Sequence, residues 1–388
     1  MPEKYDIGFL GGGQLARMSI QAAQRMGLTC ISLDPSSDSP ASQIASAITG
    51  KLDDTEAVAQ ILSRANKVTL ENEFIPATVI NDAYQLVNTR NLESDPVPPR
   101  LTQDGLTPST QALATIQDKL TQRRALQKAG VPGPKSVDLG MAFRPGAEMN
   151  FPMVLKARFG GYDGKGTRYA RTHEELMSHE SLWSQGGWLA EEFVPFKREL
   201  AVMVARTHSA AYAYPTMETI QTNHVCDLVF PSGADGSGVA IAAIEAIGGY
   251  GLFGVELFEL EDGQILVNEI APRPHNTGHY TLDWDGPSQF ETHIRCVMEY
   301  PLLPIASGSN VVMANLLGLE WAGDFRDAIP AALRHKGARF HWYGKNETKT
   351  GRKMGHLNVV GDPGEPISAI VDRAKEARDD FYTAWQGK

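Results

Sequence analysis

The first part of the chain alternates between short apolar runs and one amphipathic run. Residues 5–10 and 29–33 are apolar and predict two strands, and residues 14–26 between them predict a helix. The apolar positions of that helix fall on one face, namely Leu15, Met18, Ala22 and Met26. Gly27 then marks the helix end. The pattern predicts a strand, a helix and a second strand, which is a βαβ unit.

The turn between the first strand and the helix is rich in glycine. Gly11, Gly13 and Ala16 fit the pattern G-x-G-x-x-G/A, and Asp34 falls where a dinucleotide fold places its ribose-binding acid. One interpretation is therefore an NAD(P) site. The other is that the glycines only allow a tight turn, with the helix amides left for any anion. This stretch alone leaves both interpretations open.

The pattern changes along the chain. A strand at residues 68–70 is followed by Glu71 and Glu73, which lie either at a ligand-binding sheet edge or in a solvated loop before the next helix. From Phe151 onward, short strands and hairpins dominate and helices are few. We therefore expect an N-terminal doubly wound α/β domain followed by α+β structure.

Length and composition restrict the class of protein. With 388 residues, the chain is long enough for two or three domains, and its 42% hydrophobic and 21% charged residues are typical of a globular protein. The net charge of -10 argues against general binding to nucleic acid or to an anionic membrane. Cys30, Cys226 and Cys296 are too far apart for a metal-spaced pair. We find no leader peptide or membrane span in the sequence and expect a cytoplasmic protein.

A second glycine cluster, KARFGGYDGKGT, spans residues 156–167 between two predicted strands. Its glycines are Gly160, Gly161, Gly164 and Gly166. Free backbone amides and Lys165 suit a flap over phosphates, although the spacing differs from that of a Walker loop. Lys156 precedes the loop on an apolar strand, where an ammonium without a partner is unfavourable. We favour a phosphate-binding flap over an exposed hairpin tip.

The hairpin GVELFELEDGQILVNEIAP, residues 254–272, carries two acids on an apolar face. Asp262 and Gly263 predict a two-residue type I′ turn. That register pairs Leu260 with Ile265, Phe258 with Val267 and Glu256 with Glu269. Opposed carboxylates destabilise a sheet unless a proton or cation lies between them. With Asn268 beside them, these oxygens suit Mg²⁺ that bridges substrate phosphates, and the alternative is a solvated acidic pair.

Three further polar groups are candidates for ligand contacts. Arg273, His275, Asn276 and His279 follow the acids on a restricted loop and form a set of donors for an oxyanion. The segment WLAEEFVPFKREL offers strand backbone for an adenine edge, and Glu199 for ribose hydroxyls. The segment YGKNETKTGRKMGH gathers the basic residues Lys345, Lys349, Arg352, Lys353 and His356 in a net acidic chain, either as a phosphate-binding patch or as a solvated hairpin.

In their order, these features resemble the ATP-grasp superfamily. More narrowly, GGGQLARM, FGGYDGKGT, FKRELAV, NEIAPRPHNTGHYT, SQFETHIR and GRKMGHLN resemble the N5-carboxyaminoimidazole ribonucleotide synthetase family of purine biosynthesis. The resemblance spans nearly the whole chain. It implies a Rossmann-like pre-ATP-grasp domain over residues 1–110, an ATP-grasp lobe with the flap over 111–190, a lobe with the metal site over 191–306, and a small β-rich C-terminal domain over 307–388.

The resemblance also implies a reaction. Bicarbonate attacks the γ-phosphate of ATP to give carboxyphosphate, whose carboxyl group, as released CO₂, is taken by the exocyclic amine of aminoimidazole ribonucleotide. The implied ATP-binding residues are Lys119, Lys156, Gly161, Tyr162, Asp163, Gly164, Lys165, Gly166, Thr167, Glu191, Glu192, Phe193, Val194, Glu199, Gln221, Asn268 and Glu269. Mg²⁺, or Mn²⁺ in its place, would be held by Glu256, Asn268 and Glu269.

The remaining implied residues contact the other substrates. Bicarbonate or carboxyphosphate would be bound by Arg273, His275 and Asn276, and Asp163 is the candidate base. Aminoimidazole ribonucleotide would contact Tyr162, Asp163, Arg273, Lys345 and Arg352. A homodimer is expected from the resemblance alone. Gln221 departs from the family, because many members have His there, and Gln does not titrate.

Three rival interpretations remain. A dehydrogenase built on the first glycine turn leaves the paired acids and the second glycine loop unexplained. Another ATP-grasp enzyme, such as formate-dependent glycinamide ribonucleotide transformylase or biotin carboxylase, is similar through the middle of the chain. A non-catalytic nucleotide-binding protein is disfavoured, because every expected metal and phosphate residue is present.

Overall fold

The N-terminal part of the chain forms a doubly wound domain. A computed structural model describes residues 4–92, 101–140, 150–161, 166–305, 308–320 and 323–387. The first sheet is parallel, five-stranded and ordered β3-β2-β1-β4-β5. Its strands are β1 (Tyr5–Leu10), β2 (Cys30–Asp34), β3 (Ser46–Thr49), β4 (Ala65–Leu70) and β5 (Leu106–Thr107). This confirms the predicted βαβ unit.

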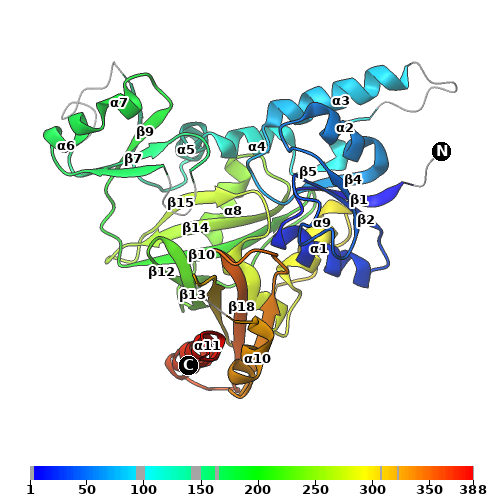
Figure 1. Cartoon of the computed structure of the whole chain (residues 1–388). Coiled ribbons are helices and arrows are strands. Elements are labelled where there is room, and N and C mark those ends of the chain that lie inside the picture. Colours follow the sequence, from blue (N-terminus) through cyan, green and yellow to red (C-terminus); the bar gives the residue numbers. More distant parts are fainter. Residues whose placement is uncertain are drawn as a thin grey trace.

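Helices cover both faces of this sheet (Figure 1). On one face lies α1 (Gln14–Arg25), where Leu15, Met18 and Ala22 are buried as predicted and Met26, just past the helix end, is half-buried. The same core takes Phe290 and Ile294 from α9 (Gln289–Val297), so a helix from much later in the chain completes this face. The opposite face is covered by α2 (Thr55–Arg64) and α3 (Ala77–Asn91).

A small lobe projects from the rest of the molecule and is joined to it through two helices (Figure 1). Its antiparallel sheet has the order β6-β9-β7-β8. The strands are β6 (Ser136–Leu139), β7 (Met153–Ala157), β8 (Thr167–Ala170) and β9 (Trp188–Glu192). The joining helices are α4 (Thr110–Gln117) and α5 (Lys119–Lys128), and the lobe itself contains α6 (His173–Ser178) and α7 (Glu180–Trp183). Leu155, Leu176 and Trp183 are buried in its own small core.

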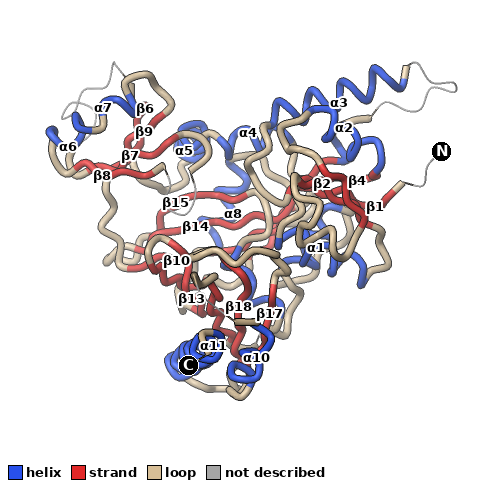
Figure 2. Tube along the Cα trace, viewed as in Figure 1, coloured by secondary structure: helices blue, strands red, loops and turns tan. Residues whose placement is uncertain are grey.

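The third sheet is the largest and runs through the centre of the molecule to its lower end (Figure 2). Eight of its nine strands follow the order β15-β14-β10-β12-β13-β16-β18-β17, and β11 pairs with β10. The strands are β10 (Arg198–Arg206), β11 (Ala211–Ala213), β12 (Met217–Thr222), β13 (Val225–Pro231), β14 (Gly251–Glu259), β15 (Ile265–Ala271), β16 (Val311–Leu317), β17 (Ala338–Trp342) and β18 (Lys353–Val360). The helices α8 (Ser237–Ala246), α10 (Phe325–Leu333) and α11 (Ile367–Trp385) pack against it.

The C-terminal strands therefore continue an existing sheet. Leu228 and Val229 of β13 pair with Ala314 and Met313 of β16. The segment after residue 307 is β-rich, as predicted, but it shares its sheet with the preceding lobe. The bounds of the four domains expected from the sequence stay predictions. In the part of the chain that the structure describes, no helix has the length and apolar character to cross a bilayer.

The hairpin between β14 and β15 corrects one prediction. Glu259, not Leu260, pairs with Ile265, and Phe258 pairs with Leu266 rather than with Val267. Gly263 has a φ of 84°, its N–H bonds the Leu260 carbonyl, and the Leu260 N–H bonds the Gln264 carbonyl. These bonds close a three-residue loop with a left-handed glycine, which is a longer hairpin type. The predicted two-residue turn is therefore wrong.

A bulge nevertheless restores the predicted pairing of the acids. The register shifts by one residue between Glu256 and Leu257, so Glu256 again faces Glu269. A bulge sets two residues of one strand against one of the other and re-aims their side chains. The extra residue is Asn268, and both Asn268 and its neighbour Glu269 line the same pocket. Val267 turns to the opposite face and joins the core under α8.

Candidate active site

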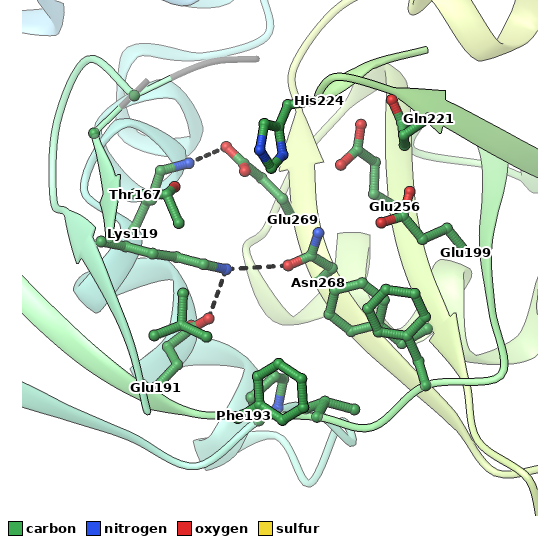
Figure 3. Close-up of a pocket in the computed structure, with 18 of the residues that line it drawn as sticks. Lys119, Thr167, Glu191, Phe193, Glu199, Gln221, His224, Glu256, Asn268 and Glu269 are labelled. Carbon is green, nitrogen blue, oxygen red and sulfur yellow. Dashed lines mark hydrogen bonds and ion pairs between the residues drawn. The ribbon is translucent and has the colours of Figure 1, made fainter. Parts of the chain in front are cut away.

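The first pocket lies between the small lobe and the central sheet. Figure 3 shows Lys119, Thr167 and Glu191 on one side, and Glu199, Gln221 and Glu256 on the other. Every described residue that the sequence predicted to bind ATP lines this pocket, namely Lys119, Lys156, Gly161, Gly166, Thr167, Glu191, Glu192, Phe193, Val194, Glu199, Gln221, Asn268 and Glu269. Tyr162, Asp163, Gly164 and Lys165 lie outside the described residues.

A buried ion-pair network fixes the wall on the small-lobe side. Lys156 Nζ lies 2.6 Å from a Glu191 carboxylate oxygen and donates to Asn268 Oδ1 at 3.1 Å. Arg123 donates to the same carboxylate at 3.1 Å. Burial opposes ionisation of Glu191, but Lys156 and Arg123 outweigh it and hold its pKa at about 2. The partner that the sequence required for Lys156, which is half-buried, is therefore Glu191.

Arg123 also connects α5 to the bulge in β15. Its guanidinium donates to the carbonyl oxygens of Val267 at 2.6 Å and of Asn268 at 2.7 Å. A planar guanidinium that bonds two successive carbonyls fixes their orientation. These two hydrogen bonds therefore join α5 directly to the Asn268 bulge.

The opposite wall concentrates negative charge. Glu256 lies between Glu269 and Glu199, and burial together with these two carboxylates raises its pKa to about 7. Glu269 is ion-paired with Lys119. Burial also raises the pKa of Glu199, to which Gln221 donates a hydrogen bond. Carboxylates that face each other repel when both are ionised, so this arrangement favours a cation between them.

These acids fit the divalent ion expected from the sequence. Mg²⁺ is usually held by one or two carboxylates together with substrate phosphates and water. Glu256, Asn268 and Glu269 present carboxylate and amide oxygens to the same space, and the Lys119 ammonium already pairs with one of them. Among the described residues, no group of three or more His, Cys, Asp or Glu side chains is placed to hold a metal ion without other ligands.

A second pocket adjoins the first and reaches into the N-terminal domain. Its walls include Gln14 and Glu71 from that domain, Arg273 from the loop after β15, and Lys345 from the C-terminal segment. Six residues line both pockets, namely Gly161, Glu256, Glu269, His275, Asn276 and Lys353. The two pockets therefore meet at the paired acids and the loop that follows them.

The glycine turn that resembled a dinucleotide site is filled by the protein itself. The carboxylate of Glu71 accepts a hydrogen bond from the Leu15 backbone amide at the start of α1. A Cβ on Gly13 would lie 2.3 Å from a Glu71 oxygen. Asp34, the candidate ribose ligand, accepts the Gly12 N–H at 2.9 Å. An internal carboxylate thus occupies the anion position of this helix, where a dinucleotide fold would bind phosphate.

Arg273 connects the second pocket to the N-terminal domain. Its guanidinium forms a two-point ion pair with Glu73, in which Nη2 donates at 2.8 Å. Burial opposes ionisation of Glu73, but Arg273 outweighs it and lowers the pKa of this carboxyl. Glu73 is one of the two acids that the sequence left open, and its partner comes from a segment about 200 residues away. Glu71 and Glu73 both line the second pocket.

The loop with His275 and Asn276 is held by side-chain amides. Gln289 accepts the His275 N–H at 2.9 Å and donates to the His275 carbonyl at 2.9 Å and to His279 Nδ1 at 2.8 Å. The amide of Asn276 pairs with that of Asn315, which donates at 2.6 Å. Burial keeps the pKa of His275 well below its usual range. The low pKa favours the neutral form of the imidazole. The two hydrogen bonds with Gln289 fix the backbone of His275.

The two basic residues expected to bind a phosphate differ in position. Lys345 lines the second pocket, where burial lowers its pKa to about 8. Arg352 lines neither pocket, although its charge contributes to that lowering. Its guanidinium donates to the Glu347 carbonyl at 3.0 Å. His279 is fully buried, so it supports the loop from behind rather than facing a pocket.

Two polar residues in or beside the pockets, His224 and Gln289, had no role assigned from the sequence, and Lys353 was named there only as one member of the basic cluster. His224 lines the first pocket and Lys353 lines both. Gln289 is the first residue of α9, and its contact with the His275 backbone gave no local sequence signal. Lys353 belongs to the basic cluster, whose spacing did not single it out. His224 lies in a hairpin turn three residues after Gln221, and strand alternation does not orient the side chain of a turn residue.

Family models match three successive segments of the chain. Residues 4–96 match a ribonucleotide synthetase preATP-grasp domain, residues 124–290 match an ATP-grasp domain, and residues 311–369 match a phosphoribosylaminoimidazole carboxylase C-terminal domain. A relative from Synechococcus elongatus, an N5-carboxyaminoimidazole ribonucleotide synthase, is 36% identical, with 96% of this chain and 92% of the relative covered. A phosphoribosylaminoimidazole carboxylase from Schizosaccharomyces pombe is also 36% identical, with 98% and 69% covered.

Solved structures agree with these matches over nearly the whole chain. The carboxyaminoimidazole ribonucleotide synthase of Aspergillus clavatus in complex with ATP has a TM-score of 0.83 at 30% identity, with 98% of this chain and 99% of that chain covered. The Aspergillus clavatus enzyme in complex with ADP and 5-aminoimidazole ribonucleotide has a TM-score of 0.84 at 29% identity, with 98% and 100% covered.

Proposed function

Because the chain belongs to the N5-carboxyaminoimidazole ribonucleotide synthase family, we propose that its two pockets divide the substrates of one ATP-dependent carboxylation. The protein is an ATP-grasp ligase of purine biosynthesis that converts 5-aminoimidazole ribonucleotide to its N5-carboxy derivative. ATP occupies the first pocket, and aminoimidazole ribonucleotide occupies the second. Bicarbonate binds where they meet. The observation that carries this division is the set of six residues that line both pockets.

The reaction needs two group transfers that share one site. An oxygen of bicarbonate forms a bond to the γ-phosphorus of ATP while the bond to the bridging oxygen of ADP breaks, which gives carboxyphosphate. The exocyclic amine then forms a bond to the carboxyl carbon, released as CO₂ when phosphate departs, and the amine loses a proton. Asp163 remains our candidate for the base that takes this proton.

The residues of the first pocket neutralise and position charge. Phosphoryl transfer depends mainly on positioning and electrostatic stabilisation. Lys119 and Lys156 point their ammonium groups at Glu269 and Asn268, so they are placed to approach phosphates bound at those side chains. Mg²⁺ held by Glu256, Asn268 and Glu269 would draw charge from the phosphates. Phe193, with the neighbouring Val194, would cover the adenine ring of ATP, and Glu199 would accept hydrogen bonds from its ribose.

The residues at the junction bind the anions that form there. Arg273 supplies a guanidinium fixed by Glu73, and His275 and Asn276 supply donors on a loop whose backbone is held by Gln289. Fixed donors aimed at developing charge lower the barrier, because they need no reorganisation during the reaction. Lys345 and Arg352 would bind the phosphate of the ribonucleotide, and Tyr162 and Asp163 would contact its aminoimidazole.

The direct test is an ADP-release assay with the full chain and Mg²⁺. We expect release that requires both bicarbonate and aminoimidazole ribonucleotide. Formate with glycinamide ribonucleotide serves as the control pair for the related ATP-grasp transformylase. ADP release with the control pair alone would reject the assignment, and micromolar NAD(P)H binding would favour the rival dehydrogenase.

We also propose a homodimer in the cytoplasm. Both expectations rest on the family resemblance. Light scattering coupled to size-exclusion chromatography measures the mass directly, and a mass near 42.3 kDa, that of one chain, would contradict the dimer. Fractionation of the source cells tests the compartment.

A further inference from the structure

A strained histidine lies at the tip of the hairpin between β12 and β13. Thr222 pairs with Val225, so the loop consists of Asn223 and His224. Both have positive φ, 52° for Asn223 and 63° for His224. Two left-handed residues in a two-residue loop form a type I′ turn, whose second position strongly favours glycine. A side chain other than glycine or asparagine is unfavourable there, and such strain persists where the surroundings or function require that residue.

The ring of His224 projects toward the first pocket (Figure 3). The pairing of β12 with β13 shifts between Ile220 and Gln221, which alters the direction of the hairpin tip. Asn223, the other turn residue, does not line the pocket. The two turn residues thus share one backbone conformation, but only His224 reaches the site.

The donors around the pocket are unevenly distributed. On the small-lobe side, Lys119 pairs with Glu269, and Lys156 pairs with Glu191. On the sheet side the Gln221 amide bonds Glu199. The His224 ring, by contrast, has no hydrogen bond or ion pair with any residue in the described ranges. An imidazole always carries at least one N–H donor, so this ring keeps a donor for a ligand.

We propose that His224 contacts the phosphate chain of bound ATP and contributes to nucleotide affinity from the sheet side of the pocket. The inference rests on the proposed placement of ATP in the first pocket. A polyphosphate beside Glu256 and Glu269 meets carboxylates on that wall, and a ring N–H there replaces water as a donor to a charged oxygen. Hydrogen bonds to charged groups are stronger than those between neutral groups.

The test uses a substitution that improves the turn while it removes the ring. His224→Gly relieves the left-handed strain, so we expect a melting temperature equal to or above that of the wild type. Calorimetric titration with MgATP should show affinity weakened by roughly tenfold, the scale of one hydrogen bond to a charged group. Binding of adenosine, which has no phosphate, should be unchanged.

Asn223→Gly is the matched control. It places glycine in the same turn but removes a side chain outside the pocket, so its MgATP affinity should equal that of the wild type. A purely structural role for His224 predicts that both glycine variants bind MgATP normally, and that result would overturn the proposal. If His224→Gly does not fold, His224→Asn, which tolerates a left-handed conformation, replaces it and should show the same loss.

These titrations contain no bicarbonate and no aminoimidazole ribonucleotide. Failure of the wild type to carboxylate the ribonucleotide would therefore reject the proposed function while the His224 comparison still stands. A His224→Gly variant that binds MgATP like the wild type would reject the inference and leave the carboxylation assay unaffected.

Discussion

At the scale of single residues, the site is organised by charge pairs that burial makes selective. Glu191 keeps its charge because Lys156 and Arg123 lie against it, whereas Glu256 is pushed toward neutrality by burial and by Glu269 and Glu199. Glu191 is therefore a stable anion on one wall of the pocket, whereas Glu256 on the other wall ionises readily only when a cation lies beside it. Such divergence of pKa values is typical of functional sites.

The paired acids give the first prediction. Glu269→Gln keeps the shape of the side chain but removes a charge that pairs with Lys119 and that we assign to Mg²⁺. We expect ADP release to fall by at least about a hundredfold, the scale of a lost electrostatic group in phosphoryl transfer. Circular dichroism should show a folded protein. A variant with near-normal turnover would contradict the metal assignment.

Gln289 gives the second prediction, because its amide fixes the His275 backbone without lining either pocket. Gln289→Glu has the same size but lacks the N–H donor for the His275 carbonyl. We expect the KM for bicarbonate to rise by about tenfold, while the KM for ATP stays within about twofold.

Thr281→Val is the control for that substitution. Thr281 Oγ1 accepts the Gln289 backbone N–H at 2.9 Å, so the variant disturbs the same helix start but leaves the side-chain amide in place. It should lower the melting temperature without changing the KM for bicarbonate. Equal effects of both variants on that KM would show that Gln289 acts only through helix stability.

At the scale of elements, two turns decide what the neighbouring strands present. The three-residue loop after β14 moves the register by one, and the Asn268 bulge moves it back. As a result, Asn268 and Glu269 both reach the pocket, which regular alternation would forbid. The turn between β1 and α1 has the shape of a dinucleotide loop, but Glu71 from the end of β4 fills it.

The third prediction concerns this glycine turn. A Cβ on Gly13 would lie 2.3 Å from a Glu71 oxygen, so Gly13→Ala must displace the carboxylate from the helix start. We expect the free energy of unfolding to fall by roughly 1–3 kcal/mol, the usual cost of overpacking, and the KM for aminoimidazole ribonucleotide to rise.

The control lies at the other end of the same helix. Gly27 has nothing within 4 Å of an added Cβ, but its φ is 77°, so Gly27→Asn tests backbone conformation without a clash. That variant should keep the normal KM for aminoimidazole ribonucleotide. A Gly13→Ala enzyme with weakened ATP affinity instead would place the nucleotide near α1 and contradict the proposed arrangement.

At the scale of the whole molecule, the two pockets take their lining residues from the N-terminal domain, the small lobe and the central sheet. Bonds that span the molecule hold this arrangement, among them the Arg273 pair with Glu73 and the contact between His293 and Thr69. Thr69 donates its hydroxyl proton to the Thr107 carbonyl at 2.7 Å, so it accepts from His293 Nε2. The other ring nitrogen, Nδ1, is buried without a partner in the described part of the chain.

The fourth prediction follows from that buried neutral ring. Burial lowers the pKa of His293 to about 3, from 6.5 for an exposed imidazole. The unfolded chain therefore binds a proton below pH 6.5 that the folded protein refuses, so stability is lost as pH falls from 6.5 toward 3. His293 alone should reduce the free energy of unfolding by about 2 kcal/mol at pH 5.

Chemical denaturation at several pH values measures this dependence. The pKa values of the buried His279 and His356 are also lowered by burial, so the loss in the intact protein should exceed that of one histidine. His293→Gln should show a shallower decline between pH 7 and pH 5. An unchanged slope in that variant would contradict a neutral buried His293.

The sequence by itself determined the local elements and the types of chemistry. Periodicity predicted the βαβ unit and the acidic hairpin, because side chains alternate with the period of the element that carries them. Spacing placed the two acids on facing strands of one hairpin, and the family motifs implied ATP and the carboxylation. The family resemblance assigned motifs far apart in the chain to one ligand, ATP. The described residues of those motifs accordingly line one pocket.

Only the tertiary structure decided which residues meet across the chain. No local pattern predicts that Glu71 fills the glycine turn, that Glu73 pairs with Arg273, or that Gln289 holds His275. Each contact joins segments that are distant in sequence or fixed by a separate element. Register was equally inaccessible, since an added loop residue and a bulge cancel each other only when the strands are paired. Long-range packing therefore decided the site, because it sets which charges and amides are buried together.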